Sequence, residues 1–340
     1  MYKLTVSASK RYQITISNNL DGFGDVARKV VTGSKVAVVT DTNVDKLYGN
    51  ALNGYLQGKT VYKYVVAAGE QSKCKDAYFQ LLEQLCADGF SRTDTVIAFG
   101  GGVVGDLASF VASTYMRGIN FVQVPTTILS AVDSSVGGKT AINLDSGKNL
   151  VGTFYQPSAV YVSTHFFNTL PQREVLSGMG EIVKYAFLSK SVTLQMIENG
   201  ADEQLVYQCL KIKRNVVQQD EKESGARALL NLGHTVGHAI ESLSNYEFSH
   251  GECVVKGIAY AVKLSQKIYN LDQATCYKMS ALLTSCGHDL TCPFSVEQLI
   301  DKISHDKKGD GAAIKFVTVK DIGKPQIVKI DYQKLQEYLS

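Results

Sequence analysis

The first half of the chain alternates apolar strand-like runs with helix-like segments, and no other feature of the sequence limits the fold more. Strands are predicted at 35–41, 61–69, 94–102 and 121–127, and helices at 74–90 and 103–116. Alternation at this spacing is typical of a parallel sheet covered by helices. Residues 1–17 alternate apolar and polar side chains, which predicts a β-hairpin ahead of that sheet.

The second half has a different pattern. After Pro171 the apolar spacing is helical to about residue 305, and a short β-pair, 315–319 with 326–330, is predicted to close the chain. We therefore predict an α/β domain over residues 1–172 and a helical domain over residues 173–340.

Composition excludes several classes of protein. The 340 residues carry a net charge of +3 and are 45% hydrophobic, so the chain can bury a large core. The pI near 8.3 argues against a nucleic-acid binder. No apolar run reaches the ~18 residues of a membrane span, and residues 1–17 do not resemble a signal peptide. The seven cysteines are scattered and lack a C-x-x-C motif, which favours reduced thiols in a cytoplasmic protein.

A polar stripe stands out in the second half. If residues 227–243 form one helix, then Arg227, Asn231, His234 and His238 fall within about 60° of one another. An apolar face lies opposite. A polar stripe of this kind can be a solvated face, but solvated faces usually carry Lys and Glu. The stripe therefore favours a functional role.

The histidines suggest a metal site. His234, His238 and His250 lie close together in the sequence, and zinc favours imidazole ligands. However, Thr235 stands where the zinc-protease motif H-E-x-x-H has its Glu. A carboxylate must then come from elsewhere, and Glu181 is a candidate. Glu181 and Lys184 share one face of an otherwise apolar helix, although a surface ion pair is the alternative interpretation.

Glycines follow a predicted strand in FGGGVVGDLASF, residues 99–110, which then opens a helix. Such a turn lets an anion approach the helix N-terminus, although a plain structural turn has the same composition. Asp41 and Asn43, at the end of an earlier strand, are suited to a ribose hydroxyl or to a helix cap. The segment 130–154, rich in Gly, Ser and Asn, is predicted to be a long functional loop.

These pieces together resemble the 3-dehydroquinate synthase family of sugar-phosphate cyclases over almost the whole chain. The motifs that carry the resemblance are VVTDTNV, GE-x-SK, GGGVVGD, Y-x-RG, QVPTTILSAVDSSVGGKTAIN, GKNLVGTFYQP, GMGEIVKY, LNLGHTVGHAIE and SHGE. The resemblance implies a Rossmann-like α/β domain and an all-helical domain, with the active site in the cleft between them.

The resemblance also implies the reaction. The substrate would be 3-deoxy-D-arabino-heptulosonate 7-phosphate, an anionic sugar phosphate, and the products 3-dehydroquinate and phosphate, in the shikimate pathway. The family oxidises a hydroxyl with NAD⁺, eliminates phosphate, reduces the ketone, opens the ring and closes a carbocycle by an aldol step. The cofactors would be tightly bound NAD⁺ and a divalent metal, Zn²⁺ or Co²⁺.

Particular residues match the family's motif positions. The metal ligands would be Glu181, His234 and His250, while His238 would face the substrate. Asp133 and Lys184 would contact the reacting hydroxyls. The remaining substrate contacts would be Lys139, Lys148, Asn149, Lys213, Arg227, Asn231 and His238. NAD⁺ would contact Asp41, Asn43, Glu70, Lys73, Gly101, Gly102, Val103, Asp106, Thr126, Thr127, Lys148, Phe166, Thr169 and Glu174.

Two further roles follow from the resemblance. Arg117 would reach the phosphate across a homodimer interface, and Lys308 would be another lysine on the phosphate side. Arg227 and Lys213 suit a carboxylate, because a guanidinium fork can bind it through two hydrogen bonds.

Other functions would require different substrates or leave some of these sequence features unexplained. A sibling cyclase, such as 2-deoxy-scyllo-inosose synthase or a valiolone-type synthase, would act on a substrate without a carboxylate. A metal-dependent polyol dehydrogenase would release NADH and need no basic phosphate pocket. A metal hydrolase would leave the glycine-rich turn unexplained, and a binding module would leave the polar stripe unexplained.

Overall fold

The computed structural model describes residues 1–306 and 313–340. Contacts divide the chain into two compact units, the first being Met1–Leu170 with Asp202–Gln218 and the second Pro171–Ala201 with Gln219–Ser340. The segment Asp202–Gln218 groups with the first unit although it lies late in the sequence. The domain boundary at residues 172 and 173 stays a prediction.

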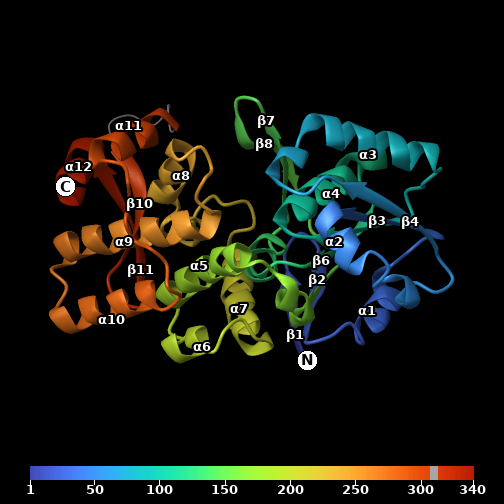
Figure 1. The fold of residues 1–340 in the computed structure, drawn as a ribbon, viewed down its shortest axis with the longest axis horizontal. Helices are drawn as coiled ribbons and strands as arrows, with labels where there is room; N and C mark the ends of the chain where they lie inside the picture. The colour runs from blue at the N-terminus through green and yellow to red at the C-terminus, as the bar shows by residue number, and fades with distance from the viewer. Residues whose placement is uncertain (307–312) are drawn as a thin grey trace. The chain divides into compact units, whose positions relative to one another are not determined.

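A sheet of seven strands forms the frame of the first unit, in the order β1-β2-β9-β6-β5-β3-β4 (Figure 1). Within the described residues, β1 and β2 pair antiparallel and every other neighbouring pair is parallel. The strands are β1 (Tyr2–Ser7), β2 (Arg11–Ser17), β3 (Lys35–Asp41), β4 (Thr60–Val66), β5 (Thr95–Gly100), β6 (Asn120–Pro125) and β9 (Ala159–Ser163). The predicted parallel α/β fold and the N-terminal hairpin are confirmed.

Apolar side chains cover both faces of this sheet, because successive residues of a strand point to opposite sides. Val36 and Val38 of β3 belong to one buried cluster, whereas Ala37 and Val39 belong to another. Helices α1 and α2 contribute to the first cluster, and α3 and α4 to the second. The bounds are α1 (Phe23–Val30), α2 (Thr42–Tyr48), α3 (Lys75–Ala87), α4 (Gly102–Thr114) and α7 (Glu203–Gln219), with short 3₁₀ helices η1 (Asn53–Tyr55), η2 (Glu70–Ser72), η3 (Tyr115–Arg117) and η5 (Thr164–Thr169).

The segment 130–154 is not the long loop that we predicted. A short π-helical turn, η4 (Ser130–Ser134), is followed by a hairpin of β7 (Lys139–Leu144) and β8 (Gly147–Phe154). Gly152 is required by the pairing itself, since a Cβ atom there would lie 1.8 Å from the Thr140 carbonyl oxygen. The prediction of a loop was wrong because close strand pairing and loops share a glycine-rich composition.

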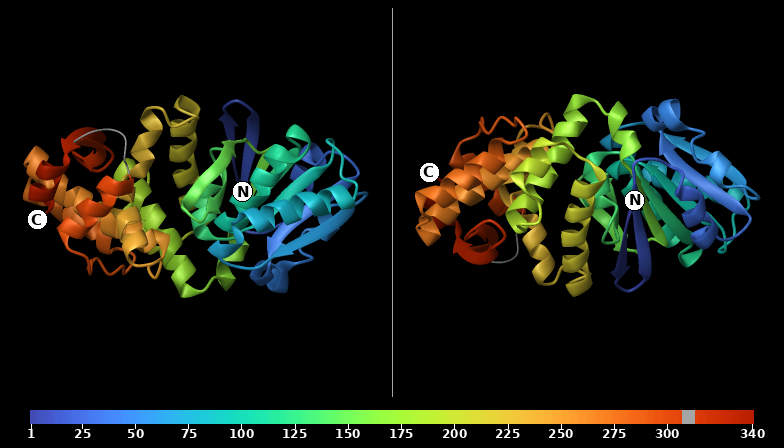
Figure 2. Two further views of the ribbon diagram at one scale, coloured as in Figure 1. Left: turned by 90° about the horizontal axis from the view of Figure 1, so that it is seen from above. Right: turned by 90° about the horizontal axis from the view of Figure 1, so that it is seen from below.

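The described residues of the second unit are mainly helical and include one hairpin, as predicted. Helix α9 runs through it and packs against α5, α8, α10 and α12 (Figure 1; Figure 2). The elements are α5 (Gln172–Leu188), α6 (Leu194–Glu198), η6 (Ala226–Asn231), α8 (His234–Leu243), α9 (His250–Tyr269), α10 (Gln273–Thr284), α11 (Val296–Asp306), β10 (Ala313–Val319), β11 (Pro325–Asp331) and α12 (Tyr332–Leu339).

The end of the chain differs from the prediction. The predicted β-pair is present, but helix α12 follows it, and Asp331 caps that helix by accepting a hydrogen bond from the Lys334 N–H at 2.7 Å. No helix in the described ranges is long and apolar enough to cross a membrane.

Candidate active site

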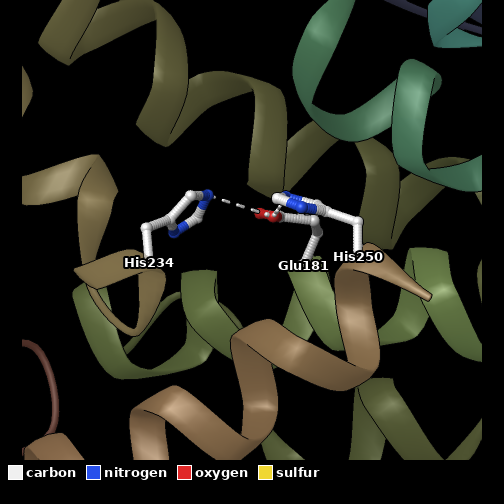
Figure 3. A group of neighbouring side chains, drawn as sticks. All are labelled: Glu181, His234 and His250. Carbon is white, nitrogen blue, oxygen red and sulfur yellow. Dashed lines mark hydrogen bonds and ion pairs between the residues drawn. The ribbon is translucent and has the colours of Figure 1, made fainter. Parts of the chain in front are cut away.

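Three side chains that we predicted as metal ligands meet in the second unit. The Glu181 carboxylate lies between two imidazole rings (Figure 3), with its Oε1 atom 3.5 Å from His234 Nε2 and 3.1 Å from His250 Nε2. One ligand atom from each residue lies within 4.8 Å of the others. The structure therefore brings together a carboxylate from α5 and histidines at the starts of α8 and α9.

Glycines allow the helices to approach closely enough for this. A Cβ on Gly251 would lie 1.9 Å from the Ser177 carbonyl oxygen, and a Cβ on Gly180 would lie 2.4 Å from the Gly251 oxygen. Helices α5 and α9 are thus in backbone contact beside Glu181 and His250. A capping box between Ser249 and Glu252 begins α9 at His250.

The predicted single helix over residues 227–243 was wrong. The chain forms η6, turns at Gly233 with φ +80°, and then begins α8 at His234. A side chain at Gly233 would also meet the Val254 carbonyl oxygen at 2.5 Å. The break places Arg227 and Asn231 on a different element from the two histidines, so the polar stripe is not one helix face.

Each predicted histidine ligand has a second partner that orients its ring. His234 Nδ1 lies 3.1 Å from the Leu232 carbonyl oxygen, and His250 Nδ1 lies 3.5 Å from Glu241 Oε2. Metal-binding histidines commonly donate their other ring N–H to a carbonyl or a carboxylate. The donor set of two imidazoles and one carboxylate fits Zn²⁺ or Co²⁺ with a position left for substrate.

Electrostatics also favour a cation here. Burial lowers the pKa of His234 to about 3, so this ring is neutral at physiological pH. Burial also acts to lower the pKa of His250, but hydrogen bonds to Glu181 and Glu241 outweigh it and raise the pKa to about 10. The two carboxylates therefore favour positive charge beside His250.

Lys184 is not on the surface. Its ammonium pairs with Glu181 Oε2, and both side chains are only 1% exposed. The alternative of a solvated ion pair is thereby excluded. A buried carboxylate needs several partners, and Glu181 has a lysine on one side and two imidazoles on the other.

A second group of possible ligands overlaps the first. His238, Glu241 and His250 also have candidate atoms within 4.8 Å of one another. The His238 ring lies 5.3 Å from the His234 ring and 5.9 Å from the His250 ring, and the residue is exposed. Glu241 was missed by our sequence analysis, although its spacing of seven from His234 places both on one helix face.

Arg227 and Asn231 lie on η6 in the same unit. Arg227 is 2% exposed, and its guanidinium donates a hydrogen bond to the Glu221 carbonyl oxygen. Asn231 Nδ2 donates to Glu223 Oε1 at 2.8 Å. Glu223 is a further polar residue that our sequence analysis did not single out.

Most residues predicted to bind NAD⁺ gather in the first unit, at the carboxyl ends of its parallel strands. Strand β3 leads to α2 and β4 on one side, whereas β5 leads to α4 and β6 on the other. The carboxyl ends of β3 and β5 therefore form a switch point, where α/β sheets commonly bind nucleotides. The predicted residues at or near these strand ends are Asp41, Asn43, Gly101, Gly102, Val103, Asp106, Thr126 and Thr127.

The glycine turn leaves little room for side chains. A Cβ on Gly101 would lie 3.1 Å from Thr127 Cγ2, and one on Gly102 would lie 3.2 Å from Ser134 Oγ. Helix α4 starts here with no side-chain cap and no acidic residue in its first turn. This N-terminus fits the phosphates of NAD⁺, whereas Asp41 caps α2 by accepting from Asn43 N at 2.8 Å.

A buried polar network lies beside this turn. Lys73 Nζ lies 2.5 Å from Asp106 Oδ2 and also donates to Asn149 Oδ1. Burial raises the pKa of Asp106, against the opposing effect of Lys73. Glu70 accepts from Asn143 Nδ2 at 2.7 Å, and our sequence analysis gave Asn143 no role although it ends one of the motifs that carry the resemblance.

The remaining predicted residues are dispersed. Lys213 on α7 is buried and lies 3.0 Å from Asp133 Oδ1 on η4. Phe166 and Thr169 lie on η5, where Thr169 contacts Tyr48, and Glu174 lies on α5 in the second unit. Lys139 and Lys148 lie on the β7–β8 hairpin and Arg117 on η3, while Lys308 falls outside the described residues.

Comparisons with known proteins identify the family of the chain. Residues 63–177 match the 3-dehydroquinate synthase N-terminal family, and residues 178–309 match the C-terminal family. A 3-dehydroquinate synthase of Alkaliphilus metalliredigens is 38% identical, covering 100% of this chain and 98% of the relative. One of Enterococcus faecalis strain V583 is 41% identical, covering 99% and 98%.

A solved structure supports the same fold. The crystal structure of 2-deoxy-scyllo-inosose synthase, complexed with carbaglucose-6-phosphate, NAD⁺ and Co²⁺, superposes with a TM-score of 0.89 at 25% identity and covers 99% of each chain. The sequence similarity to 3-dehydroquinate synthases is higher and spans the whole length. The chain therefore belongs to the 3-dehydroquinate synthase family.

Proposed function

We propose that this chain converts 3-deoxy-D-arabino-heptulosonate 7-phosphate into 3-dehydroquinate and phosphate. The observation that carries the proposal is identity of 37–41% to 3-dehydroquinate synthases along the whole chain. The reaction oxidises one hydroxyl, eliminates phosphate, returns the hydride, and then opens and recloses the ring. It is a lyase reaction without net oxidation, because the hydride that leaves the substrate is returned to it.

Two cofactors are needed, and this chain has residues that fit both. Bound at Glu181, His234 and His250, a divalent metal such as Zn²⁺ or Co²⁺ supplies Lewis acidity that makes a substrate hydroxyl easier to oxidise. Bound at the switch point of the sheet, NAD⁺ supplies the reversible hydride acceptor. The first and second units thus carry different parts of the chemistry.

The reacting hydroxyls face groups that can hold charge and move protons. Lys184 keeps its ammonium beside Glu181 with almost no access to solvent, which strengthens its attraction to a developing alkoxide. We assign proton exchange with water to the ring of His238, which is exposed next to the two histidine ligands. Asp133, paired with Lys213, is assigned to a second hydroxyl.

The substrate carboxylate is assigned to Arg227. A buried guanidinium can bind a carboxylate through two parallel hydrogen bonds, and these bonds are strong where water is excluded. Asn231 lies four residues further on η6 and supplies an amide to the same end of the substrate. A sibling cyclase acting on a sugar phosphate without a carboxylate would gain nothing from Arg227.

The phosphate is assigned to residues of one hairpin and to Lys308. Lys139, Lys148 and Asn149 lie on the β7–β8 hairpin, and Asn149 adopts the left-handed conformation with φ +58°. Lys73 holds the Asn149 side chain, which links an NAD⁺-binding residue to a substrate-binding residue. Lys308 remains a predicted phosphate contact.

Arg117 is proposed to act across a homodimer interface. It is exposed, and it follows Met116 in a pair of left-handed residues, with φ +48° for Met116 and +67° for Arg117. Such strain is uncommon outside functional segments. Mixing the inactive variants Arg117→Ala and Lys184→Ala should restore part of the activity if Arg117 completes the partner's site. No recovery in a verified mixed dimer would contradict the proposal.

The direct test follows phosphate release from the heptulosonate phosphate together with the absorbance of NADH. We expect phosphate release without accumulating NADH, and loss of release when a chelator is added. Accumulating NADH would indicate a polyol dehydrogenase instead. Release that persists without NAD⁺ would indicate a metal hydrolase, and activity only on glucose 6-phosphate or sedoheptulose 7-phosphate would indicate a sibling cyclase.

The proposed cellular location is the cytoplasm. All seven cysteines are free thiols, as expected in a reducing compartment. Fractionation of cells that produce the chain would test this assignment.

A further inference from the structure

Asp220 makes four hydrogen bonds that the proposed chemistry does not use. It directly follows α7 and is 9% exposed. Its Oδ1 atom accepts from Ser224 N at 2.8 Å and from Ser224 Oγ at 3.1 Å, and its Oδ2 atom accepts from Gly225 N at 2.7 Å and from Arg227 N at 2.9 Å. One carboxylate therefore closes the loop between residues 220 and 227.

This loop needs an internal partner, because part of its backbone is strained. Glu223 has φ +59°, in the left-handed region that side chains with a Cβ rarely adopt. A residue in this conformation lowers the stability of the fold by about 1–3 kcal/mol, and it persists only when surrounding contacts hold it there. Asp220 holds Glu223 in this conformation by accepting hydrogen bonds from the N–H groups of Ser224 and Gly225, which directly follow it.

The loop in turn holds the groups assigned to the substrate carboxylate. The Arg227 guanidinium donates to the Glu221 carbonyl oxygen, and Asn231 Nδ2 donates to Glu223 Oε1 at 2.8 Å. Both side chains are therefore anchored to residues that lie within the loop closed by Asp220. A shift of the loop would move both at once.

We propose that Asp220 is a positioning residue, which fixes the main chain at Arg227 so that the guanidinium is presented to the substrate carboxylate. The proposal rests on the proposed function, because it requires a substrate that Arg227 binds. It predicts a defect in substrate binding, whereas a purely structural role predicts lower stability alone.

The structure offers a matched control in Asp94. This carboxylate also accepts four hydrogen bonds, three from backbone N–H groups and one from a serine hydroxyl: Ser34 N at 3.0 Å, Lys35 N at 2.9 Å, Ser91 N at 2.7 Å and Ser91 Oγ at 2.8 Å. Asp94 lies directly before β5, at the end of the strand opposite to the glycine turn. Asp94→Asn thus removes a similar set of bonds without touching Arg227.

The test compares Asp220→Asn with Asp94→Asn in the whole enzyme loaded with metal and NAD⁺. Asp220→Asn should raise KM for the heptulosonate phosphate about tenfold, since small misplacements of binding groups have effects of this size or larger. Metal content and NAD⁺ affinity should stay at the wild-type values. Asp94→Asn should lower Tm about as much as Asp220→Asn does, but it should leave KM unchanged.

A double-mutant cycle shows whether Asp220 acts through Arg227. In the Arg227→Ala background, Asp220→Asn should change KM by less than about twofold, because the group that it positions is gone. If the two effects multiply, or if Asp220→Asn alone leaves KM unchanged, the proposal is overturned. If both aspartate variants raise KM equally, the role of Asp220 is general stability.

Two outcomes separate this inference from the proposed function. Wild-type protein that releases no phosphate from the heptulosonate phosphate would overturn both. Wild-type protein that is active, with a normal KM for Asp220→Asn, would overturn only the positioning role. Should Asp220→Asn fail to fold, Asp220→Glu keeps the charge but displaces the carboxylate, and a raised KM is still expected.

Discussion

Each unit of the chain has a buried lysine–carboxylate pair beside residues predicted to bind NAD⁺ or the metal, but the surroundings of these two pairs differ. In the first unit, Lys73 and Asp106 are 5% and 20% exposed, and Lys73 also bonds to Asn149. In the second, Lys184 and Glu181 are both 1% exposed, and the other oxygen of Glu181 faces two imidazoles.

The difference shows that a buried ion pair does not by itself define a site. Burying two charges is costly, and the cost is recovered only where further polar groups satisfy them. Beside Lys73 lies the amide of Asn149, which suits hydrogen bonds to a cofactor. Around Glu181 these groups are imidazoles, which suit a metal.

The largest expected effect comes from removing the metal ligands. His250→Ala should leave the chain folded, without bound metal, and with phosphate release reduced at least about a thousandfold. Metal analysis of the purified variant and circular dichroism measure these properties. His305→Ala, an exposed histidine on α11, serves as the control and should behave as wild type. Full activity of His250→Ala after chelation would refute the ligand assignment.

Removing the metal from the wild type should have a similar effect that is reversible. A chelator should abolish turnover and lower Tm, because a ligand that binds only the folded state stabilises it. Added Zn²⁺ or Co²⁺ should restore both. In Glu181→Gln the chelator should no longer change Tm, and an undiminished shift there would place the metal elsewhere.

Breaking the Lys73–Asp106 pair should weaken NAD⁺ binding and leave metal binding unchanged. Lys73→Met leaves Asp106 buried without its cation, which costs about 3 kcal/mol. We expect weaker NAD⁺ binding by about tenfold, measured by calorimetry, with unchanged metal content. Loss of metal in Lys73→Met would show that the two pairs are coupled.

The helix contact beside Glu181 should be sensitive to a single methyl group. Gly251→Ala places a Cβ 1.9 Å from the Ser177 carbonyl oxygen, so α5 and α9 must separate. Overpacking of this kind costs about 1–3 kcal/mol, and metal affinity should fall with it. Gly54→Ala is the matched control in the first unit, because no atom lies within 4 Å of the position that its methyl group would take. Equal metal affinity in both variants would contradict this view of the contact.

The smallest effect concerns acid stability. Burial acts to raise the pKa of Asp94, but hydrogen bonds from Ser91, Lys35 and Ser34 outweigh it and hold the pKa below its usual range. Because the folded-state pKa is the lower one, this stabilisation is present above about pH 4 and is lost as the pH falls through the folded-state value. Urea unfolding across this range should show a weaker pH dependence for Asp94→Asn than for wild type.

Local patterns in the sequence were sufficient to predict the sheet, whereas the proposed metal ligands came from the resemblance to the family. Apolar runs that alternate with helical segments predicted the parallel strands, because a strand buried on both faces needs a nearly continuous apolar sequence. The resemblance to the family named Glu181, His234 and His250, and the structure places these side chains together. Their roles remain predictions for experiment.

Only the tertiary structure showed which residues position the predicted site residues or bond to them. Gly233 breaks the expected helix because its backbone is left-handed and α9 passes close to it, which no helical pattern reveals. Asn143 bonds to Glu70, and Asp220 bonds to the N–H of Arg227, and each pair of residues is brought together only by folding of the chain. Periodicity reports which face of an element is buried, whereas hydrogen bonds between loops depend on three-dimensional proximity that the sequence does not encode locally.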